Sequence, residues 1–157
     1  MVLLNVNNNF SSTRDILINS KYNIMAISLA SSMLDEIMQE AFDENVIEEY
    51  VASTSLMSNI GPDNEAYGSY DDIDDFDNYW YETEPVDKTK PRYVPGPVYR
   101  VWVDVNYINP AQPNLAQNTK TFYKKVTVNV TMPYLAGEVL PADTVKLEKV
   151  FTYFIFR

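Results

Sequence analysis

Residues 12–42 read STRDILINSKYNIMAISLASSMLDEIMQEAF, and this stretch decides the fold because it predicts one long amphipathic helix. Its apolar side chains recur three and four residues apart, which places them on one stripe of an α-helix. They are Tyr22, Met25, Ala26, Leu29, Ala30, Met33, Leu34, Ile37, Met38 and Ala41. Ser12 and Asp15 have the spacing of a capping box. We therefore expect a helix over residues 12–43, with residues 1–11 as a lead-in.

The next part of the chain, residues 44–97, is expected to be an acidic, aromatic loop region. Residues 63–87 hold ten Asp and Glu, no Lys or Arg, and six interleaved aromatic side chains. Disordered acidic segments are usually poor in aromatic residues. We therefore expect an ordered loop whose aromatic side chains pin it to the body and whose carboxylates face solvent.

The remainder, residues 98–157, contains three stretches with the period-2 alternation of half-buried strands: residues 98–108, 121–132 and 145–156. Short connections favour an antiparallel meander of three to four strands. A phase slip between Leu147 and Val150 predicts a bulge. The apolar end, residues 151–156, predicts a central or doubly covered strand. Together these patterns predict a single α+β domain over residues 1–157, with the long helix packed on the sheet.

The composition excludes several functions. The net charge is −10 and the pI is about 4.3, which argues against nucleic acid and anionic lipid as partners. The chain has no cysteine and no histidine, so disulfides, thiolate zinc sites and Ser-His-Asp or Cys-His catalysis are excluded. No apolar run reaches the length of a membrane span. Asp and Glu pairs, Tyr and Lys are the acid–base candidates that remain. Because no cleft is signalled, we expect a protein that is not an enzyme.

Five aspartates of the acidic region are candidate calcium ligands: Asp71, Asp72, Asp74, Asp75 and Asp77. Calcium takes six to eight oxygen ligands, and closely spaced carboxylates supply them. An EF-hand loop is not matched, because the sixth position holds no glycine. The alternative is a solvated acidic patch that steers a basic partner.

Several motifs together resemble the type IV pilin-like family, in particular minor pilins and pseudopilins of the MSHA and pilus-assembly class. The runs Ala26–Ala30, Met33–Ile37 and Ala41–Glu44 look like the helix of these proteins. The runs Asp71–Asp77, Tyr123–Val130 and Val145–Leu147 are similar to their acidic loop and to two of their strands. The order and spacing of the motifs carry the resemblance.

The resemblance implies a structural subunit, or a minor or initiating component, of a type IV pilus or secretion pseudopilus. Its partners would be other pilin or pseudopilin subunits, at the periplasmic or extracellular face of a bacterial inner membrane or in a surface filament. Family members carry a preceding apolar helix half, cut after a glycine. This chain begins at Met1 without one, so we expect membrane contact only through that missing segment.

We expect the helix to have two zones, because its dense apolar stripe starts at Tyr22. Residues from Met25 to Phe42 should meet the sheet, and the preceding part should meet other subunits. The expected subunit-interface residues are Val2, Leu3, Leu4, Val6, Phe10, Ile16, Leu17 and Ile18.

The alternative function is a carbohydrate-binding or adhesive module that uses the acidic aromatic loop, with calcium as a candidate cofactor. Aromatic side chains stack on sugar rings, but they are also what a loop uses to pack on a sheet. The long helix argues against the alternative, because an all-β module does not need it. A third hypothesis is an enzyme that uses two of the carboxylates for catalysis. Nothing in the sequence indicates the cleft that such an enzyme needs.

Overall fold

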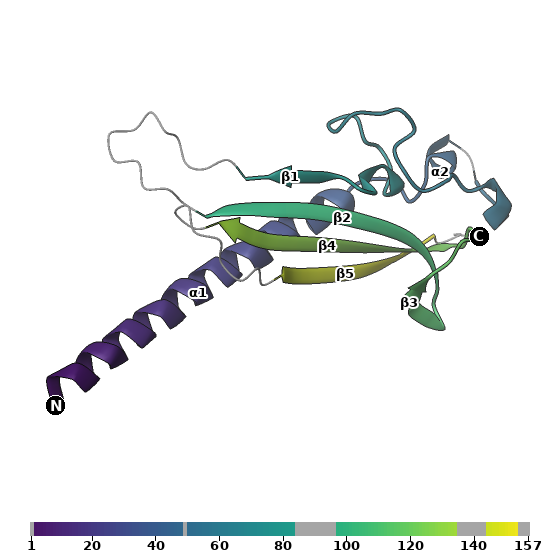
Figure 1. Ribbon diagram of the computed structural model, residues 1–157. Helices are drawn as coiled ribbons and strands as arrows, with labels where there is room; N and C mark the ends of the chain where they lie inside the picture. The colour runs from purple at the N-terminus through teal and green to yellow at the C-terminus, as the bar shows by residue number, and fades with distance from the viewer. Residues whose placement is uncertain (1, 49, 84–96, 135–143, 154–157) are drawn as a thin grey trace.

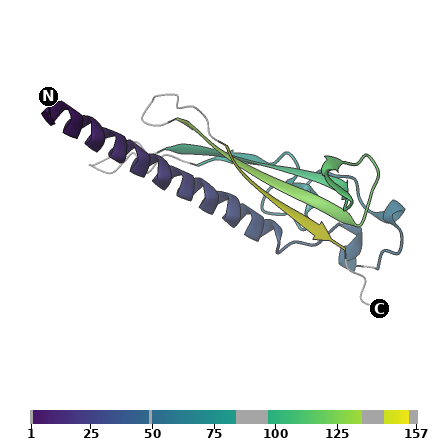
Figure 2. The same cartoon turned by 90° about the horizontal axis from the view of Figure 1, so that it is seen from below.

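A computed structural model describes residues 2–48, 50–83, 97–134 and 144–153 and shows one long helix lying along one face of an antiparallel sheet (Figures 1 and 2). The helix is α1 (Val2–Ile37). The strands are β1 (Trp80–Glu82), β2 (Val98–Asn109), β3 (Gln112–Ala116), β4 (Tyr123–Tyr134) and β5 (Thr144–Thr152). The one-turn helix α2 (Asn45–Glu48) and two 3₁₀ turns, η1 (Thr54–Leu56) and η2 (Asp74–Phe76), lie between α1 and β1. The α+β prediction is confirmed.

The sheet order is β1-β2-β4-β5, with β3 paired to the end of β2. Five strands replace the three to four expected. The two extra strands are short: β1 comes from the predicted loop region, and β3 from the predicted loop between the first two strands. Every residue of β3 is exposed, and β1 turns one side chain, Tyr81, toward the core. Both form by pairing with β2, whose twelve residues offer a long run of backbone donors and acceptors.

The bounds of the helix differ from the prediction at both ends. It begins at Val2, so the expected lead-in is helical and Ser12 lies inside the helix rather than at a cap. It ends at Ile37, and a turn follows where the helix was expected to continue to residue 43. At 1.5 Å per residue its 36 residues span about 54 Å.

The core lies between α1 and the inner face of the sheet. Helix α1 contributes the predicted stripe, and β2 and β4 contribute the valines predicted to point inward. The buried members are Ala26, Ala30, Met33, Leu34 and Ile37 from α1, and Val101, Val103, Val105, Val126, Val128 and Val130 from the sheet. These members are confirmed, because periodicity reports directly which side of an element is buried. The prediction is wrong for Met25 and Met38, which are 42% and 40% exposed; Met38 comes after the last residue of α1.

Strand β5 contradicts two predictions. Its pairing with β4 runs without a register shift from Thr131↔Thr144 to Tyr123↔Thr152, so there is no bulge. The apparent phase slip arises because Lys149 occupies an inward position, where its ammonium lies 5.6 Å from the centre of the Phe151 ring. A lysine can do this by packing its methylene stem on apolar surface. Among the described strands β5 is also an edge strand rather than a central one, and residues 154–157 lie outside the described part.

Candidate functional site

A buried charge cluster joins the end of α1 to the acidic loop and the sheet. Its centre is Lys124 of β4, whose side chain is fully buried. The Lys124 ammonium donates to the Phe42 carbonyl at 2.7 Å, to Asp43 Oδ2 at 3.1 Å and to Asp74 Oδ1. Its three donors therefore meet three acceptors, which is the condition for keeping a charge inside a protein.

The Asp43 carboxylate is satisfied from several sides. It accepts hydrogen bonds from the Ser58 N–H and Oγ, both at 3.0 Å, and from the Tyr107 hydroxyl at 3.1 Å. Burial alone would raise the pKa of Asp43, but the Lys124 charge and the backbone N–H of Ser58 outweigh it and hold the pKa below its ordinary value. The cluster is closed and hydrogen-bonded, so its geometry serves structure rather than chemistry.

The sequence reasoning missed this cluster, although one signal was present. Lys124 lies in phase with Val126 and Val128, so a strand with those valines inward also turns Lys124 inward. A lysine at such a position predicts a buried partner of opposite charge. The alternation does not say which of the many acidic residues that partner is.

The five predicted calcium ligands surround η2, and protein donors engage most of them. Asp72 Oδ1 accepts the backbone N–H of Asp74 and Asp75, at 2.8 and 3.2 Å. Asp75 Oδ2 accepts the N–H of Asp71 at 3.2 Å, and Asp77 Oδ1 accepts that of Val105 at 2.8 Å. Asp72, Asp74 and Asp75 are buried, so the expectation that the carboxylates of this loop face solvent is wrong for these three.

A smaller group of carboxylates remains near one another. Ligand oxygens of Glu65, Asp71 and Asp75 all lie within 4.8 Å of each other. The pKa of Glu65 is raised by desolvation and by the charges of Asp75 and Asp71. Three carboxylates supply only part of the shell of six to eight oxygens that calcium takes. Calcium binding stays a prediction.

Most aromatic side chains of the acidic loop pack on each other and on the core, which confirms that they pin the loop to the body. Tyr67 stacks on Tyr79 with ring centres 4.3 Å apart, and Tyr70 meets Phe76 edge-on at 5.0 Å. The Tyr67 hydroxyl donates to Glu36 of α1 at 2.8 Å. These rings therefore pack on one another and on α1, although Tyr67 is 49% exposed. Sugar binding by this loop stays a prediction.

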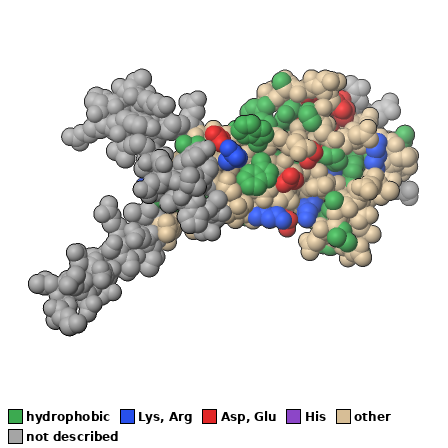
Figure 3. Space-filling model, in the orientation of Figure 1, with side chains coloured by type: hydrophobic (Ala, Val, Ile, Leu, Met, Phe, Trp, Pro, Cys, Tyr) green, Lys and Arg blue, Asp and Glu red, His purple; other side chains and the backbone are tan. Residues whose placement is uncertain are grey.

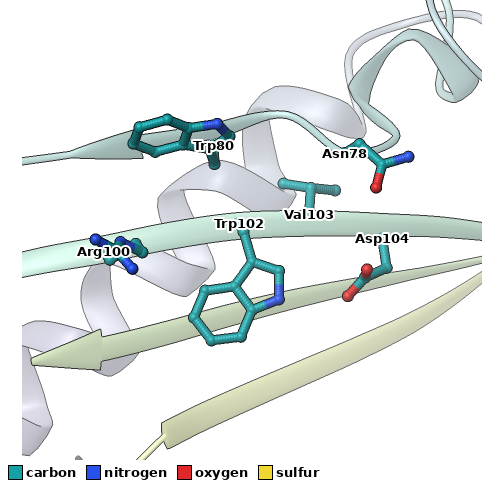
Figure 4. Close-up of a pocket in the computed structure, with 6 residues that line it drawn as sticks. All are labelled: Asn78, Trp80, Arg100, Trp102, Val103 and Asp104. Atoms are coloured by element: carbon teal, nitrogen blue, oxygen red, sulfur yellow. The ribbon is translucent and has the colours of Figure 1, made fainter. Parts of the chain in front are cut away.

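Trp80 is different, because 61% of it is exposed. It lies opposite Trp102 in the β1–β2 register, and both face away from α1 (Figure 4). Together with Asn78, Arg100 and Asp104 they line an open hollow of about 420 Å³. The Arg100 guanidinium lies 6.0 Å from the centre of the Trp80 ring, within the range of a cation–π contact.

The predicted subunit interface falls on the first half of α1. Its backbone is helical from Val2 onward. Leu17 is the one member of the predicted set whose side chain the structure describes, and it is 66% exposed. The side chains of Val2, Leu3, Leu4, Val6, Phe10, Ile16 and Ile18 lie outside the described part.

Comparison with protein-family models, with curated proteins and with solved structures finds no match for this chain. Within the described residues, no helix combines the length and the apolar character needed to cross a membrane. The function therefore has to be argued from the geometry above.

Proposed function

We propose that this chain is a structural, non-enzymatic subunit of a type IV pilus or secretion pseudopilus that packs against other subunits through the first half of α1. The observation that carries the proposal is the overhang of α1 beyond the sheet (Figures 1 and 2). The first buried side chain among those described on α1 is Ala26. The residues before Tyr22 correspond to about 30 Å of helix.

The described side chains of α1 away from its buried stripe include large apolar ones. Leu17, Ile24 and Ile27 are 66%, 64% and 48% exposed. A helix that is apolar on more than one face is typical of a helix covered on more than one face. Packing against the α1 helices of other subunits would cover these side chains.

The motifs that resemble the pilin-like family support the proposal from a second direction. The helix motifs from Ala26 to Ile37 coincide with the part of α1 that packs on the sheet, and Tyr123–Val130 lies within β4. A helix-first chain packed on an antiparallel sheet is the architecture that the resemblance implies. The proposal places the subunit in the cell envelope or in a surface filament, with other pilin-like subunits as partners.

Site-directed labelling tests the proposal, because the chain has no cysteine of its own. Leu17→Cys, made in the source cells, should react with a maleimide in isolated subunits and be protected in the assembled filament. Leu56→Cys is the matched control, since Leu56 is 58% exposed and lies in η1, away from α1. Equal labelling of Leu17→Cys in both states would reject packing through α1.

The reading frame upstream of Met1 is an independent test of the family. A glycine followed by about 20 apolar residues, the length of a membrane helix, would support the proposal. A stop codon or an ordinary polar sequence there would reject it.

A further inference from the structure

The outer face of the sheet, opposite α1, carries two hollows that adjoin. The first is the Trp80–Trp102 hollow of Figure 4, and the second has a volume of about 400 Å³. Trp102 and Asp104 line both, so the hollows form one trough, which we call the outer trough. In the space-filling view, hydrophobic and charged side chains gather on this face (Figure 3).

The two tryptophans of the trough do not contribute to the hydrophobic core that stabilises the fold. Val101, Val103 and Val105 of β2 belong to the core, and Trp102 points to the opposite side. Trp80 lies on a three-residue strand and is mostly exposed. Trp80 and Trp102 are directly opposed in the register of β1 and β2, and both indoles border the first hollow (Figure 4). Exposed apolar surface of this kind, bordered by polar side chains, is typical of a binding site.

The charges around the trough compensate each other. Arg100 pairs with Glu82 at 2.6 Å, and Glu148 accepts from Lys125 at 3.3 Å and lies 2.8 Å from Lys146. The Asp104 carboxylate accepts from the Asn129 amide at 2.9 Å. The charged side chains here are Arg100, Lys125 and Lys146 against Glu82, Asp104 and Glu148, in a chain whose net charge is −10. This balance favours a neutral ligand over an anion or a cation.

The remaining polar lining consists of neutral groups that both donate and accept hydrogen bonds. Asn78 borders the first hollow, and Asn106 and Asn114 line the second. Thr127 and Asn129 also line the second hollow and bond to Glu148 and Asp104 there. A pyranose ring offers the matching chemistry: an apolar face of C–H groups for an indole, and a rim of hydroxyls for amides and hydroxyls.

We propose that the outer trough binds a neutral oligosaccharide, with one ring on Trp80 and Trp102 and the next in the polar hollow beside Asn114. A flat, β-1,4-linked glycan fits the open face of a sheet better than a coiled one. The site is on the opposite side of the sheet from α1, so this binding does not depend on filament assembly.

Tryptophan fluorescence tests the proposal directly, because Trp80 and Trp102 are the two tryptophans of the chain. Titration with cellopentaose, chitopentaose and maltopentaose, backed by calorimetry, should change the emission with at least one of the β-linked pentasaccharides. Trp102→Ala should weaken binding by about tenfold or more, because an aromatic stacking contact is lost. Tyr50→Ala is the matched control, since Tyr50 is 58% exposed and lies outside the trough.

A second variant covers the case in which Trp102→Ala fails to fold. Asn114→Ala changes an exposed residue of β3 and leaves both tryptophans in place. It should weaken the pentasaccharide and leave the emission of the free protein unchanged. The proposal is overturned if no pentasaccharide binds at about 10 mM, weaker than ordinary specific recognition, or if the variants bind as tightly as the parent. Neither result would bear on the Leu17→Cys labelling.

Discussion

Replacing Lys124 with methionine should lower the free energy of unfolding by about 3–5 kcal/mol at pH 7. Methionine keeps most of the length and volume of the side chain, so the packing around Phe42 and Tyr107 should change little. What the variant removes is the ammonium that faces two buried carboxylates, Asp43 and Asp74. Removing one partner of a buried ion pair leaves the other as an uncompensated charge.

The size of the loss follows from what each carboxylate retains. Asp43 keeps the donors of Ser58 and Tyr107. Asp74 shares the one Ser58 hydroxyl proton with Asp43, stays next to the Asp72 carboxyl and is 1% exposed. The variant can relieve the repulsion by holding one proton in the folded state, which costs about 4 kcal/mol at pH 7 relative to an unfolded-chain aspartate of ordinary pKa near 4. At pH 5 the same protonation costs about 1.5 kcal/mol.

This gives the prediction a pH signature. A carboxyl that holds its proton in the folded state, but not in the unfolded state, makes stability fall as pH rises. The free energy of unfolding of the variant should therefore be close to that of the parent at pH 5 and lower than that of the parent at pH 7. Urea unfolding followed by circular dichroism at both values measures the difference, and at pH 7 the melting temperature should drop by roughly 6–20 °C.

One further variant serves as the control, and a second tests whether the loss can be reversed. Lys146→Met removes a lysine whose side chain is 54% exposed and whose partner is Glu148, and it should cost less than about 1 kcal/mol. Adding Asp74→Asn to Lys124→Met removes one of the stranded carboxylates and should restore part of the stability. The reasoning is refuted if Lys124→Met costs under about 1 kcal/mol at pH 7, or if its cost is the same at pH 5.

Three other predictions concern the core and the acidic loop. Met33→Asp places an unpaired charge on the buried stripe of α1 and should cost several kcal/mol in thermal or urea unfolding; an unchanged melting temperature would reject the stripe. Ala30→Leu should cost about 1–3 kcal/mol by overpacking a fully buried site, whereas Ser31→Leu on the exposed side should stay within about 0.5 kcal/mol. Burial and the neighbouring Asp74 raise the pKa of Asp72 to about 8, so the parent should lose stability between pH 4 and pH 8. Asp72→Asn cannot titrate and should flatten that loss in melting curves; an equally steep loss would contradict the assignment.

The sequence predicts those parts of the fold in which the polarity of each residue indicates whether that residue is buried. The α1 stripe and the alternating valines of β2 and β4 are of this kind. The start of α1 was missed because Asn7, Asn8 and Asn9 are weak helix formers that indicate a loop. In the structure they extend a helix that is already formed, and extending a helix is much easier than nucleating one.

The parts that were missed depend on pairs of residues far apart in the chain. The sequence shows Lys124, Asp43 and Asp74 as three charges among many, and only the fold reveals that they meet. Likewise, Trp80 is one of six aromatics of an acidic stretch, and Trp102 is an outward residue of a strand. They border one hollow because β1 pairs with β2. Patterns within single stretches of sequence therefore indicate a binding site in the acidic loop, and they do not indicate one on the sheet.

The proposed packing surface on α1 and the proposed ligand site lie on opposite faces of the sheet. Asp43 follows the end of α1 by six residues and meets Lys124 on β4, the strand that pairs with both β2 and β5. A force on the overhanging part of α1 would thus reach the centre of the sheet through the buried stripe and through the charge cluster. The outer trough lies on the opposite face, and Val103 is the residue that it shares with the buried core. If subunits pack through α1, the trough stays open to solvent, so each site can be altered and tested without disturbing the other.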